Sequence, residues 1–281
     1  MTNQSALYIV PTPIGNLSDI SLRAIEVLST VAAVAAEDTR HSTKLLSYHG
    51  IHTPLISYHD HGGEAQVARI IGKLEQGESV ALISDAGTPL ISDPGYRLVS
   101  EVRAQGYDVV PLPGACALIT ALSAAGLASD RFSFEGFPPA KSQGRKTLFS
   151  ELAQMPHTLI FYESTHRILD SLEDMGSVFG DDRRCVIARE LTKTFETFID
   201  GSLAHVLERV RDDRNQQKGE FVVLIEGFKP VESEGISAEA EKVLVVLLEE
   251  LSVKQASALA AKITGEKKNK LYQWALSKKQ D

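Results

Sequence analysis

Short apolar runs alternate with amphipathic segments over the first 114 residues, and this alternation constrains the fold more than any other feature of the sequence. The runs ALYIVP, VAAVAAE, PLISY, SVALIS and DVVPL have the length of buried strands, and the segments between them repeat apolar residues at helical spacing. Repeats of strand, helix and strand build a parallel sheet with helices on both faces. We therefore expect an α/β domain whose functional loops follow the carboxyl ends of the strands.

The pattern of expected helices and strands changes after Gly114. A helix over ALITALSAAGL precedes five strand-like runs, FSFEGF, HTLIFYES, CVIARELT, TFETFIDG and GEFVVLIEG. Several of these lie close together without a clear helix between them, which predicts a mixed sheet. We interpret the segment PPAKSQGRKT, residues 138–147, as a long polar loop with three basic residues.

The last part of the chain has a different composition. FKPVESEGIS reads as a linker, and three short amphipathic helices are expected after it, over roughly residues 238–251, 253–263 and 267–277. The turn TGEKKN between the last two fits a helix-turn-helix unit and equally a plain helical bundle. The expected domains are thus residues 1–113, 114–229 and 236–281.

Composition bounds the class of protein. With 281 residues, 43% hydrophobic and 23% charged, the chain is typical of a globular protein, and no apolar run approaches the roughly 20 residues of a membrane span. The start, MTNQSALYIV, has no basic region of a signal peptide, and Cys116 and Cys185 have no metal-binding spacing. We expect a cytoplasmic protein with reduced thiols.

The charge is unevenly distributed. A net charge of −8 argues weakly against nucleic acid as a partner. Residues 231–250, however, hold six acids against one lysine, whereas residues 252–281 hold seven lysines against two acids. The basic end is either a solvated helix face or a nucleic-acid contact.

The strand-end loops narrow the class of ligand. They read PTPIGN, EDTRHS, YHDHGG, SDAGTPLISDPG and PLPGACA, and none has a P-loop or a dinucleotide-binding pattern. These loops are rich in carboxylates, namely Glu37, Asp38, Asp60, Asp85 and Asp93. An anionic ligand would be repelled there, whereas adenosyl-methionine carries a cationic sulfonium and an ammonium group.

Two features of these loops have alternative interpretations. His41, His59, Asp60 and His61 leave a metal site open, although we expect none. Asp93 and Pro94 are interpreted as the N-cap and first turn of the following helix.

Seven motifs occur in one order, LYIVPTPIGNLSDIS, AEDTRHSTKLL, SDAGTPLISDPG, PLPGACALITAL, FYESTHRI, ARELTKTFE and GEFVVLIEG. Together they resemble the bacterial 16S ribosomal RNA cytidine 2′-O-methyltransferases, a group within the tetrapyrrole methylase superfamily. The resemblance implies a two-domain α/β fold, with a parallel-sheet N-terminal domain and a mixed-sheet second domain, plus a small helical C-terminal domain. It also implies adenosyl-methionine as cofactor, 16S ribosomal RNA or the small ribosomal subunit as substrate, and a homodimer.

The resemblance also assigns a cofactor site. GTPLI stands where the superfamily has G-D-P before two apolar residues, so that Thr88 replaces the usual acid and Asp85 lies close enough to supply a charge. Ala115 and Cys116 would open a helix whose free N–H groups receive the carboxylate of the cofactor. The implied cofactor residues are Ile14, Asp85, Gly87, Thr88, Pro89, Ile91, Ala115, Cys116, Tyr162, Ala188 and Phe221.

Methyl transfer to a ribose hydroxyl is helped by a base, and RNA must be held by cations. The candidate catalytic residues are Glu37, Asp38, Arg40, Glu190 and Lys193, with a structural Asp38–Arg40 ion pair as the alternative. The candidate RNA-binding residues are Lys141, Arg145, Lys146, Arg167, Arg183, Arg184, Arg189, Lys267, Lys268 and Lys270. Tyr272 and Trp274 would contact RNA or, as we favour, pack in the terminal helix core.

Two other functions remain open at this point. One is a small-molecule methylase that acts on a tetrapyrrole, and the other is an RNA-binding assembly factor without catalysis. The basic loop and the helical appendage favour RNA, since a macrocycle needs neither.

Overall fold

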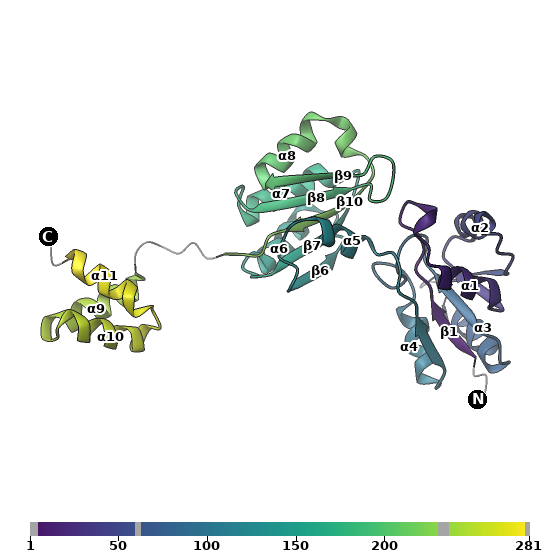
Figure 1. Cartoon of the computed structure of the whole chain (residues 1–281), viewed down its shortest axis with the longest axis horizontal. Coiled ribbons are helices and arrows are strands. Elements are labelled where there is room, and N and C mark those ends of the chain that lie inside the picture. Colours follow the sequence, from purple (N-terminus) through teal and green to yellow (C-terminus); the bar gives the residue numbers. More distant parts are fainter. Residues whose placement is uncertain (1–4, 60–62, 230–235, 279–281) are drawn as a thin grey trace. The chain divides into compact units, whose positions relative to one another are not determined.

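The computed structural model of the protein describes residues 5–59, 63–229 and 236–278. The chain divides into two compact units, Met1–Phe228 and Lys229–Asp281, and each is described by itself (Figure 1).

The first sheet of the larger unit is wholly parallel. Its strands are β1 (Ala6–Ile9), β2 (Ala33–Ala36), β3 (Leu55–Ser57), β4 (Val80–Ile83) and β5 (Asp108–Pro111), in the order β3-β2-β4-β1-β5. The central strands β2 and β4 are buried along their whole length, which explains their unbroken apolar sequence.

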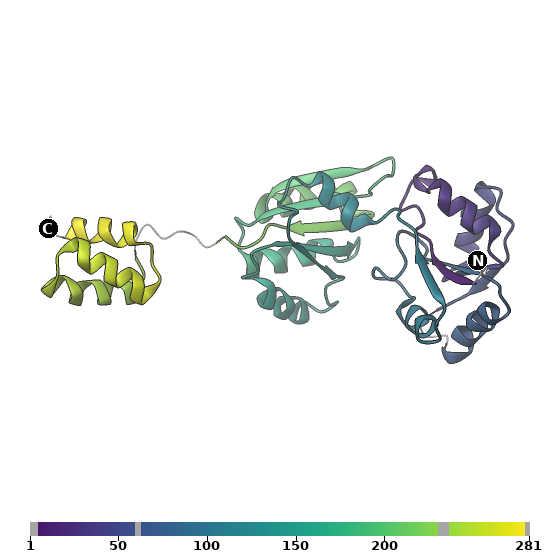
Figure 2. The ribbon, with the colours of Figure 1, turned by 60° about the horizontal axis from the view of Figure 1, so that its bottom comes forward.

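Helices cover both faces of this sheet (Figure 2). The helices α1 (Leu22–Thr30) and α2 (Thr39–Tyr48) pack on one face through Leu28 and Leu45. The helices α3 (Gly63–Glu75) and α4 (Tyr96–Ala104) pack on the other through Ile70 and Leu98. The short 3-10 helix η1 (Leu17–Asp19) precedes α1.

The strand order creates a topological switch point. The neighbours β1 and β4 send their chains in opposite directions, since β1 leads to β2 and β4 leads to β5 on the far side of β1. In open α/β sheets such a divergence leaves a crevice at the carboxyl ends of the two strands. The loops after β1 and β4, PTPIGN and SDAGTPLISDPG, therefore line the place where a ligand is expected.

The second sheet is mixed, as the sequence predicted. It contains β6 (Phe132–Gly136), β7 (Thr158–Ser164), β8 (Arg184–Arg189), β9 (Thr197–Ser202) and β10 (Glu220–Ile225), in the order β6-β7-β10-β8-β9. β6 and β7 pair in parallel, and the other pairs are antiparallel.

The two faces of this second sheet are covered unequally. The helices α6 (Ser142–Leu152), α7 (Ile168–Phe179) and α8 (Leu203–Asp212) pack on one face around Phe161, and the 3-10 helix η3 (Arg214–Gln217) follows α8. Among the described helices, only α5 (Ala117–Ala124) packs on the other face, through Leu118 and Leu122. Part of the second face is thus free to form the wall of a cavity.

The prediction of a polar loop over residues 138–147 is wrong, because α6 begins at Ser142. The cause is Arg145, whose side chain is 3% exposed. Its Nε and Nη2 atoms each lie 2.8 Å from Oδ2 of Asp174 on α7, and its Nη1 donates to the carbonyl of Ala140. A buried ion pair therefore fixes the start of α6 where composition alone suggested a loop.

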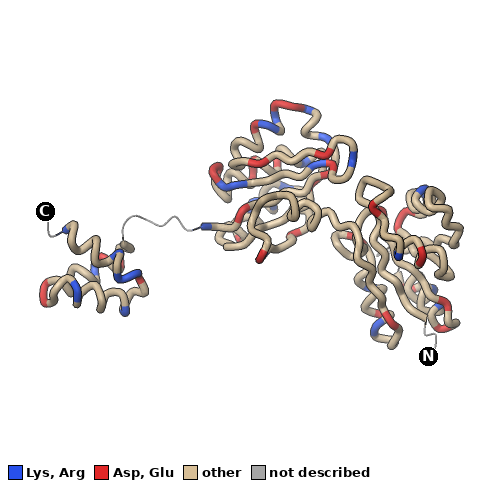
Figure 3. The backbone as a smooth tube through the Cα atoms, in the orientation of Figure 1, with Lys and Arg blue, Asp and Glu red and all other residues tan. Residues whose placement is uncertain are grey.

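The smaller unit consists of α9 (Ala238–Glu250), α10 (Val253–Thr264) and α11 (Lys268–Lys278). Its core is built around Leu244 and Leu271, with small side chains that let the helices approach closely, and Trp274 packs against it. Acidic residues gather on α9, and lysines on α10 and α11 (Figure 3). No helix in the described ranges is both long and apolar enough to cross a membrane.

We predict that Arg145→Met lowers the free energy of unfolding by about 3–5 kcal/mol, because it leaves the buried carboxylate of Asp174 without its partner. Lys146, whose Nζ lies 3.4 Å from the same carboxylate, is 44% exposed. Lys146→Met is the matched control and should cost less than about 1 kcal/mol. Urea unfolding followed by circular dichroism measures both, and equal midpoints would contradict the account.

Candidate active site

A cavity of about 490 Å³ lies between the loops after β1 and β4 and the open face of the second sheet. Its volume falls in the range of pockets that bind small molecules. The described residues that line it are Ile14, Asp85, Ala86, Gly87, Thr88, Ile91, Ser92, Asp93, Cys116, Ala117, Phe137, Tyr162, Glu163, Ser164, Thr165, His166, Leu191, Gly219, Glu220, Phe221 and Val222.

The loops after β1 and β4 are joined by backbone hydrogen bonds. Thr12 N donates to Gly87 O at 2.9 Å, and Gly87 N donates to Thr12 O at 3.0 Å. The buried hydroxyl of Thr12 also donates to Ser84 O. Gly87 has a φ of 84°, and a Cβ there would lie 3.3 Å from Ile14, so glycine keeps this wall of the cavity flat.

The segment that enters α5 lies against the same loops. Thr88 Oγ1 donates to Ala115 O at 2.9 Å, and a Cβ on Gly114 would lie 2.6 Å from Pro11. Cys116 is the N-cap of α5 and makes no side-chain capping bond, while Leu118 N donates to the hydroxyl of Tyr162. Cys116 and Ala117 at the start of α5 line the cavity, and a helix N-terminus is a place that can receive a carboxylate.

Eight of the eleven residues that the family resemblance assigns to the cofactor line this cavity. Pro89, Ala115 and Ala188 are not among its described lining residues: Pro89 and Ala188 are buried, and Ala115 uses its carbonyl to accept from Thr88. The cofactor role of these residues stays a prediction. Sequence reasoning missed the lining segment Glu163 to His166, although its motif, FYESTHRI, was recognised and only Tyr162 was assigned.

Asp93 does not cap α4, so that expectation is wrong. The N-cap of α4 is Gly95, with a φ of 136° and no side-chain hydrogen bond. Asp93 instead lines the cavity. Burial raises its pKa to about 6 against a hydrogen bond with Ser84, and the nearby carboxylates of Glu37 and Asp85 add to the rise.

Tyr162 lies across the cavity on β7. Burial raises the pKa of its phenol, and Cys116 and Asp93 act in the same direction. The ring makes edge contacts with Phe134 and Phe137, at centroid distances of 4.7 Å and 5.6 Å. Tyr162 therefore stays protonated and serves as a fixed apolar wall with one hydroxyl.

Asp38 and Arg40 are placed in a structural role at the start of α2. The Asp38 carboxylate accepts from Arg40 N and His41 N, and these bonds lower its pKa. Asp38 N in turn donates to the carboxylate of Asp85 at 3.1 Å. Arg40 lies 3.6 Å from Asp38 with its side chain 92% exposed. Neither residue lines the described cavity, which favours the alternative of a cap and surface ion pair.

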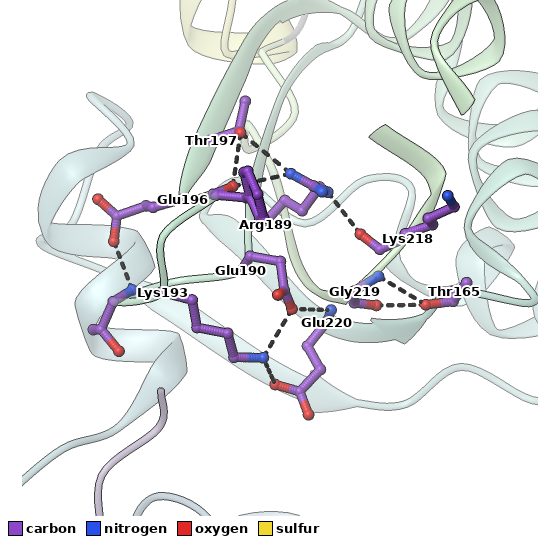
Figure 4. A network of polar contacts seen from close by, with 11 residues as sticks. Thr165, Arg189, Glu190, Lys193, Glu196, Thr197, Lys218, Gly219 and Glu220 are labelled. Atoms are coloured by element: carbon purple, nitrogen blue, oxygen red, sulfur yellow. Dashed lines mark hydrogen bonds and ion pairs between the residues drawn. The ribbon is translucent and has the colours of Figure 1, made fainter. Parts of the chain in front are cut away.

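Glu190 and Lys193 belong to a network with Glu220, which Figure 4 shows from close by. Lys193 Nζ lies 2.8 Å from Glu190 and 2.9 Å from Glu220. Desolvation opposes both charges, but the hydrogen bonds outweigh it, so the pKa of Glu190 is lowered and that of Lys193 is raised. Both shifts make these groups poorer proton acceptors at neutral pH.

The loop that carries this network is strained and closely packed. Glu190 and Thr192 have φ values of 51° and 63°, in the left-handed region that non-glycine residues rarely adopt. A Cβ on Gly15 would lie 2.5 Å from Lys193, 2.7 Å from Thr192 and 2.8 Å from Leu191 O. The PTPIGN loop and the ELTK loop therefore meet with no room between them.

Several basic residues predicted to bind RNA are occupied by protein contacts. Arg189 is buried and donates to the carbonyls of Lys218 and Phe195, and Arg145 is buried against Asp174. Neither guanidinium is available to a phosphate, so we remove both from the RNA-binding set.

The other arginines of that set are paired in ways that leave them partly accessible. Arg167 pairs with Glu163 at 2.9 Å, and Arg184 pairs with Asp200 at 2.8 Å. Arg183 donates to the carbonyls of Glu226 and Ala153, and burial lowers its pKa. These residues hold the second sheet together, whatever else they bind.

Part of the histidine-rich loop after β3 can be placed. His59 hydrogen-bonds to Ser57 at 2.9 Å, whereas Asp60 and His61 lie outside the described residues. Among the residues that are described, no three His, Cys, Asp or Glu side chains gather as a metal-binding group.

The fold and the cavity together describe an α/β protein with a small-molecule site beside the carboxyl ends of its parallel strands. Residues 6–207 match the family Tetrapyrrole (Corrin/Porphyrin) Methylases, and residues 234–279 match the family RsmI C-terminal HTH domain. The chain belongs to the tetrapyrrole methylase family and, within it, to the group of ribosomal RNA small subunit methyltransferases I.

Two relatives carry that last description. The chain is 58% identical to the Pseudomonas aeruginosa "Ribosomal RNA small subunit methyltransferase I" over 273 residues, which covers 97% of each chain. It is 55% identical to the Escherichia coli O157:H7 protein of the same description, over 98% of this chain and 96% of that one.

Solved structures support the fold alone. Diphthine synthase aligns with a TM-score of 0.63 at 16% identity, over 79% of this chain and 90% of that chain. The cobalamin biosynthetic enzyme cobalt precorrin-4 methyltransferase aligns with a TM-score of 0.58, also at 16% identity, over 79% of this chain and 94% of that chain.

Membership of this family implies adenosyl-methionine as methyl donor. The cavity fits such a group on three counts. It has the volume for a small ligand, it has a flat wall at Gly87, and the carboxylates of Asp85 and Asp93 face it without a lining lysine or arginine. A cationic ligand gains from that charge, whereas a free phosphate would be repelled.

We predict that Gly15→Ala weakens the binding of adenosyl-methionine at least about tenfold, because the added methyl group must push Ile14 or Leu191 out of place. Both of these residues line the cavity. Gly72→Ala is the matched control, since a Cβ there meets nothing within 4 Å. Isothermal titration calorimetry measures both affinities, and equal dissociation constants would show that the loops can separate freely.

Proposed function

We propose that the protein transfers a methyl group from adenosyl-methionine to the 2′-hydroxyl of a cytidine ribose in 16S ribosomal RNA. The observation that carries this proposal is the match over nearly the whole chain to relatives described as ribosomal RNA small subunit methyltransferases I. We further propose that it acts in the cytoplasm, where small subunits are assembled, and as a homodimer.

The residues of the chain would promote the reaction chiefly by holding the cofactor and the ribose in the right positions. Bound adenosyl-methionine supplies an electrophilic methyl group on a positively charged sulfur. Gly87, Thr88 and Ile14 would form the wall against which this group lies, and the start of α5 would receive its carboxylate. Asp85 and Asp93 would face its positive charges. Transfer needs the ribose oxygen held roughly 3–3.5 Å from the methyl carbon, in line with the breaking bond.

The small C-terminal unit would hold RNA. Lys268 on α11 is exposed, and Lys267 and Lys270 lie in the same turn region, which supports a contact with phosphate groups. Lys141 and the half-exposed Lys146 in the second sheet domain would add to it. Trp274 packs against the core of the small unit, so stacking on a base is left out of the proposal.

The test is a methyl-transfer assay with labelled adenosyl-methionine and three acceptors: assembled small ribosomal subunits, naked 16S RNA and a porphyrin precursor. We expect label in the RNA, either free or in the subunit, and in a 2′-O-methylated cytidine on nuclease digestion. Label in the porphyrin alone would favour the tetrapyrrole alternative. Cofactor binding without transfer to any acceptor would favour the non-catalytic assembly factor.

A double variant separates the RNA contact from the chemistry in the same assay. Lys268→Gln with Lys270→Gln should raise the KM for RNA, because each lysine neutralises a phosphate, and leave the affinity for adenosyl-methionine unchanged. Lys242→Gln on the acidic helix α9 is the matched control. An unchanged KM and an unchanged salt dependence would remove the C-terminal lysines from the proposal.

A further inference from the structure

The ring of Phe137 lies at the mouth of the cavity, on the loop that follows β6. Phe137 lines the cavity together with Tyr162 and Phe221, but of these three aromatic residues it alone is exposed, with an exposed fraction of 52%. Leaving a side chain of this size in water forgoes about 1.5–3 kcal/mol of burial. Such a ring, placed beside a ligand site, is available to a partner that covers it.

A β-bulge comes immediately before this ring. Phe134 on β6 pairs with Ile160, and Gly136 pairs with the next residue of β7, Phe161, so β6 contains one residue more than β7 over this stretch. Gly136 has a φ of 68°, which residues with a side chain rarely adopt. Bulges bend a strand and re-aim the side chains around them, often beside active sites. The bulge thus ends the strand pairing where the chain reaches the cavity.

Two arginines hold the loop that carries the ring. Nη1 of Arg167 donates to the carbonyl of Pro138 at 3.2 Å, and Nη1 of Arg145 donates to the carbonyl of Ala140 at 2.8 Å. Each arginine is in turn paired with a buried carboxylate. The two residues after the ring are prolines, whose φ is fixed by their own rings. Phe137 is therefore presented on a preorganised backbone, and a partner that contacts it has little of the loop left to order.

The ring has a face to offer. Phe137 makes an edge contact with Tyr162, with the centroids 5.6 Å apart and the planes at 65° to each other. Tyr162 is itself fixed by a second edge contact, with Phe134, and by the hydrogen bond from Leu118 N to its hydroxyl. An inclined contact of this kind occupies at most one face of Phe137. A flat aromatic group can therefore stack on the open face.

The segment that follows the ring is basic, which suits a nucleic acid. Residues 137–150 contain Lys141, Arg145 and Lys146 and no aspartate or glutamate. Arg145 is buried, whereas Lys141 is exposed and the Lys146 side chain is 44% exposed. Proteins that bind single-stranded RNA combine aromatic side chains that stack on bases with cations along the backbone. This loop has both, and its charge is opposite to that of the acidic loops of the first sheet.

We propose that Phe137 stacks on the base of the nucleotide whose ribose is methylated. The ribose must enter the cavity to reach the methyl group, and the base attached to that ribose then lies near the mouth, where the ring is. An unpaired base can be splayed out of a single strand and stacked on an aromatic side chain. Every base has such a face, so the contact selects an unstacked nucleotide and orients its ribose without distinguishing cytosine from uracil. This assignment rests on the proposed function.

The test compares Phe137→Leu with Phe137→Trp in methyl transfer to the acceptor that wild type labels. Phe137→Leu keeps an apolar side chain but has no aromatic face, and we expect it to raise the KM for RNA at least about fivefold with little change in kcat. Phe137→Trp restores an aromatic face and should keep the KM within about threefold of wild type. Both variants should bind adenosyl-methionine within about threefold of wild type by calorimetry.

Phe132→Leu is the matched control. Phe132 is 40% exposed at the start of the same strand, and it is not among the described residues that line the cavity. Its replacement should leave the KM for RNA and the affinity for adenosyl-methionine unchanged. Thermal unfolding and sedimentation of all three variants should match wild type, which shows that neither folding nor oligomeric state has changed.

A thermodynamic cycle tests which part of the RNA the ring contacts. The acceptor RNA is assembled by ligation with an abasic ribose at the methylated position, so that the ribose is kept and the base is removed. If the ring stacks on this base, Phe137→Leu and the abasic change remove the same contact. Their combined loss in kcat/KM should then be at least about threefold smaller than the product of the two separate losses. Independent losses would show that the ring contacts something other than this base.

Four further results would overturn the proposal. A rise in KM below about fivefold in Phe137→Leu would show that the ring does not hold RNA. A loss of cofactor affinity beyond about threefold would make Phe137 a wall of the cofactor site. An equal loss in Phe137→Trp would show that shape matters and the aromatic face does not. A changed sedimentation coefficient would show that a second copy of the chain covers the ring. By contrast, a wild-type protein that labels no RNA would refute the proposed function itself, and this assignment with it.

Discussion

The pair of backbone hydrogen bonds between Thr12 and Gly87 is the constraint on which the rest of the site depends. It joins the loops after β1 and β4, the two neighbouring strands whose chains leave in opposite directions. The bridge therefore sets the distance between the two loops, which carry Ile14 and Gly87 on the cavity wall. The loop after β4 carries Asp85, Asp93 and Thr88, which donates to Ala115, and the bridge joins this loop to the one that carries Ile14.

The second sheet supplies the opposite wall because its helices are unevenly distributed. Three helices cover one face, whereas within the described ranges the short helix α5 alone covers the other, where Tyr162 and Val222 line the cavity. The ion-paired network at Glu190, Lys193 and Glu220 then fixes this sheet's loop against Gly15. The cavity is therefore defined by packing on both sides, and its negative charge comes from the first sheet's loops.

Much of this architecture follows from the sequence, because the parallel strands and the C-terminal helices have strong apolar patterns. Three features could not be predicted from pattern alone. The start of α6 depends on a buried partner, Asp174, which lies 29 residues from Arg145. The orientation of Asp93 depends on left-handed backbone at Leu90 and Ser92. Because neither residue is glycine, the sequence does not indicate this conformation. The burial of Arg189 depends on carbonyls contributed by other loops. For Arg145 and Arg189 a contact distant in sequence overrides the local preference, and for Asp93 an uncommon backbone conformation does so.

We infer that the cavity between the β4 loop and the second sheet holds adenosyl-methionine. Hydrogen exchange with and without saturating adenosyl-methionine tests it most directly, because a bound ligand slows the opening of the segments that it contacts. We expect slower exchange in residues 84–93, 116–118 and 162–166, with no change in residues 236–278. If calorimetry shows that adenosyl-methionine saturates the protein but the slower exchange is confined to other segments, the cofactor does not bind in this cavity.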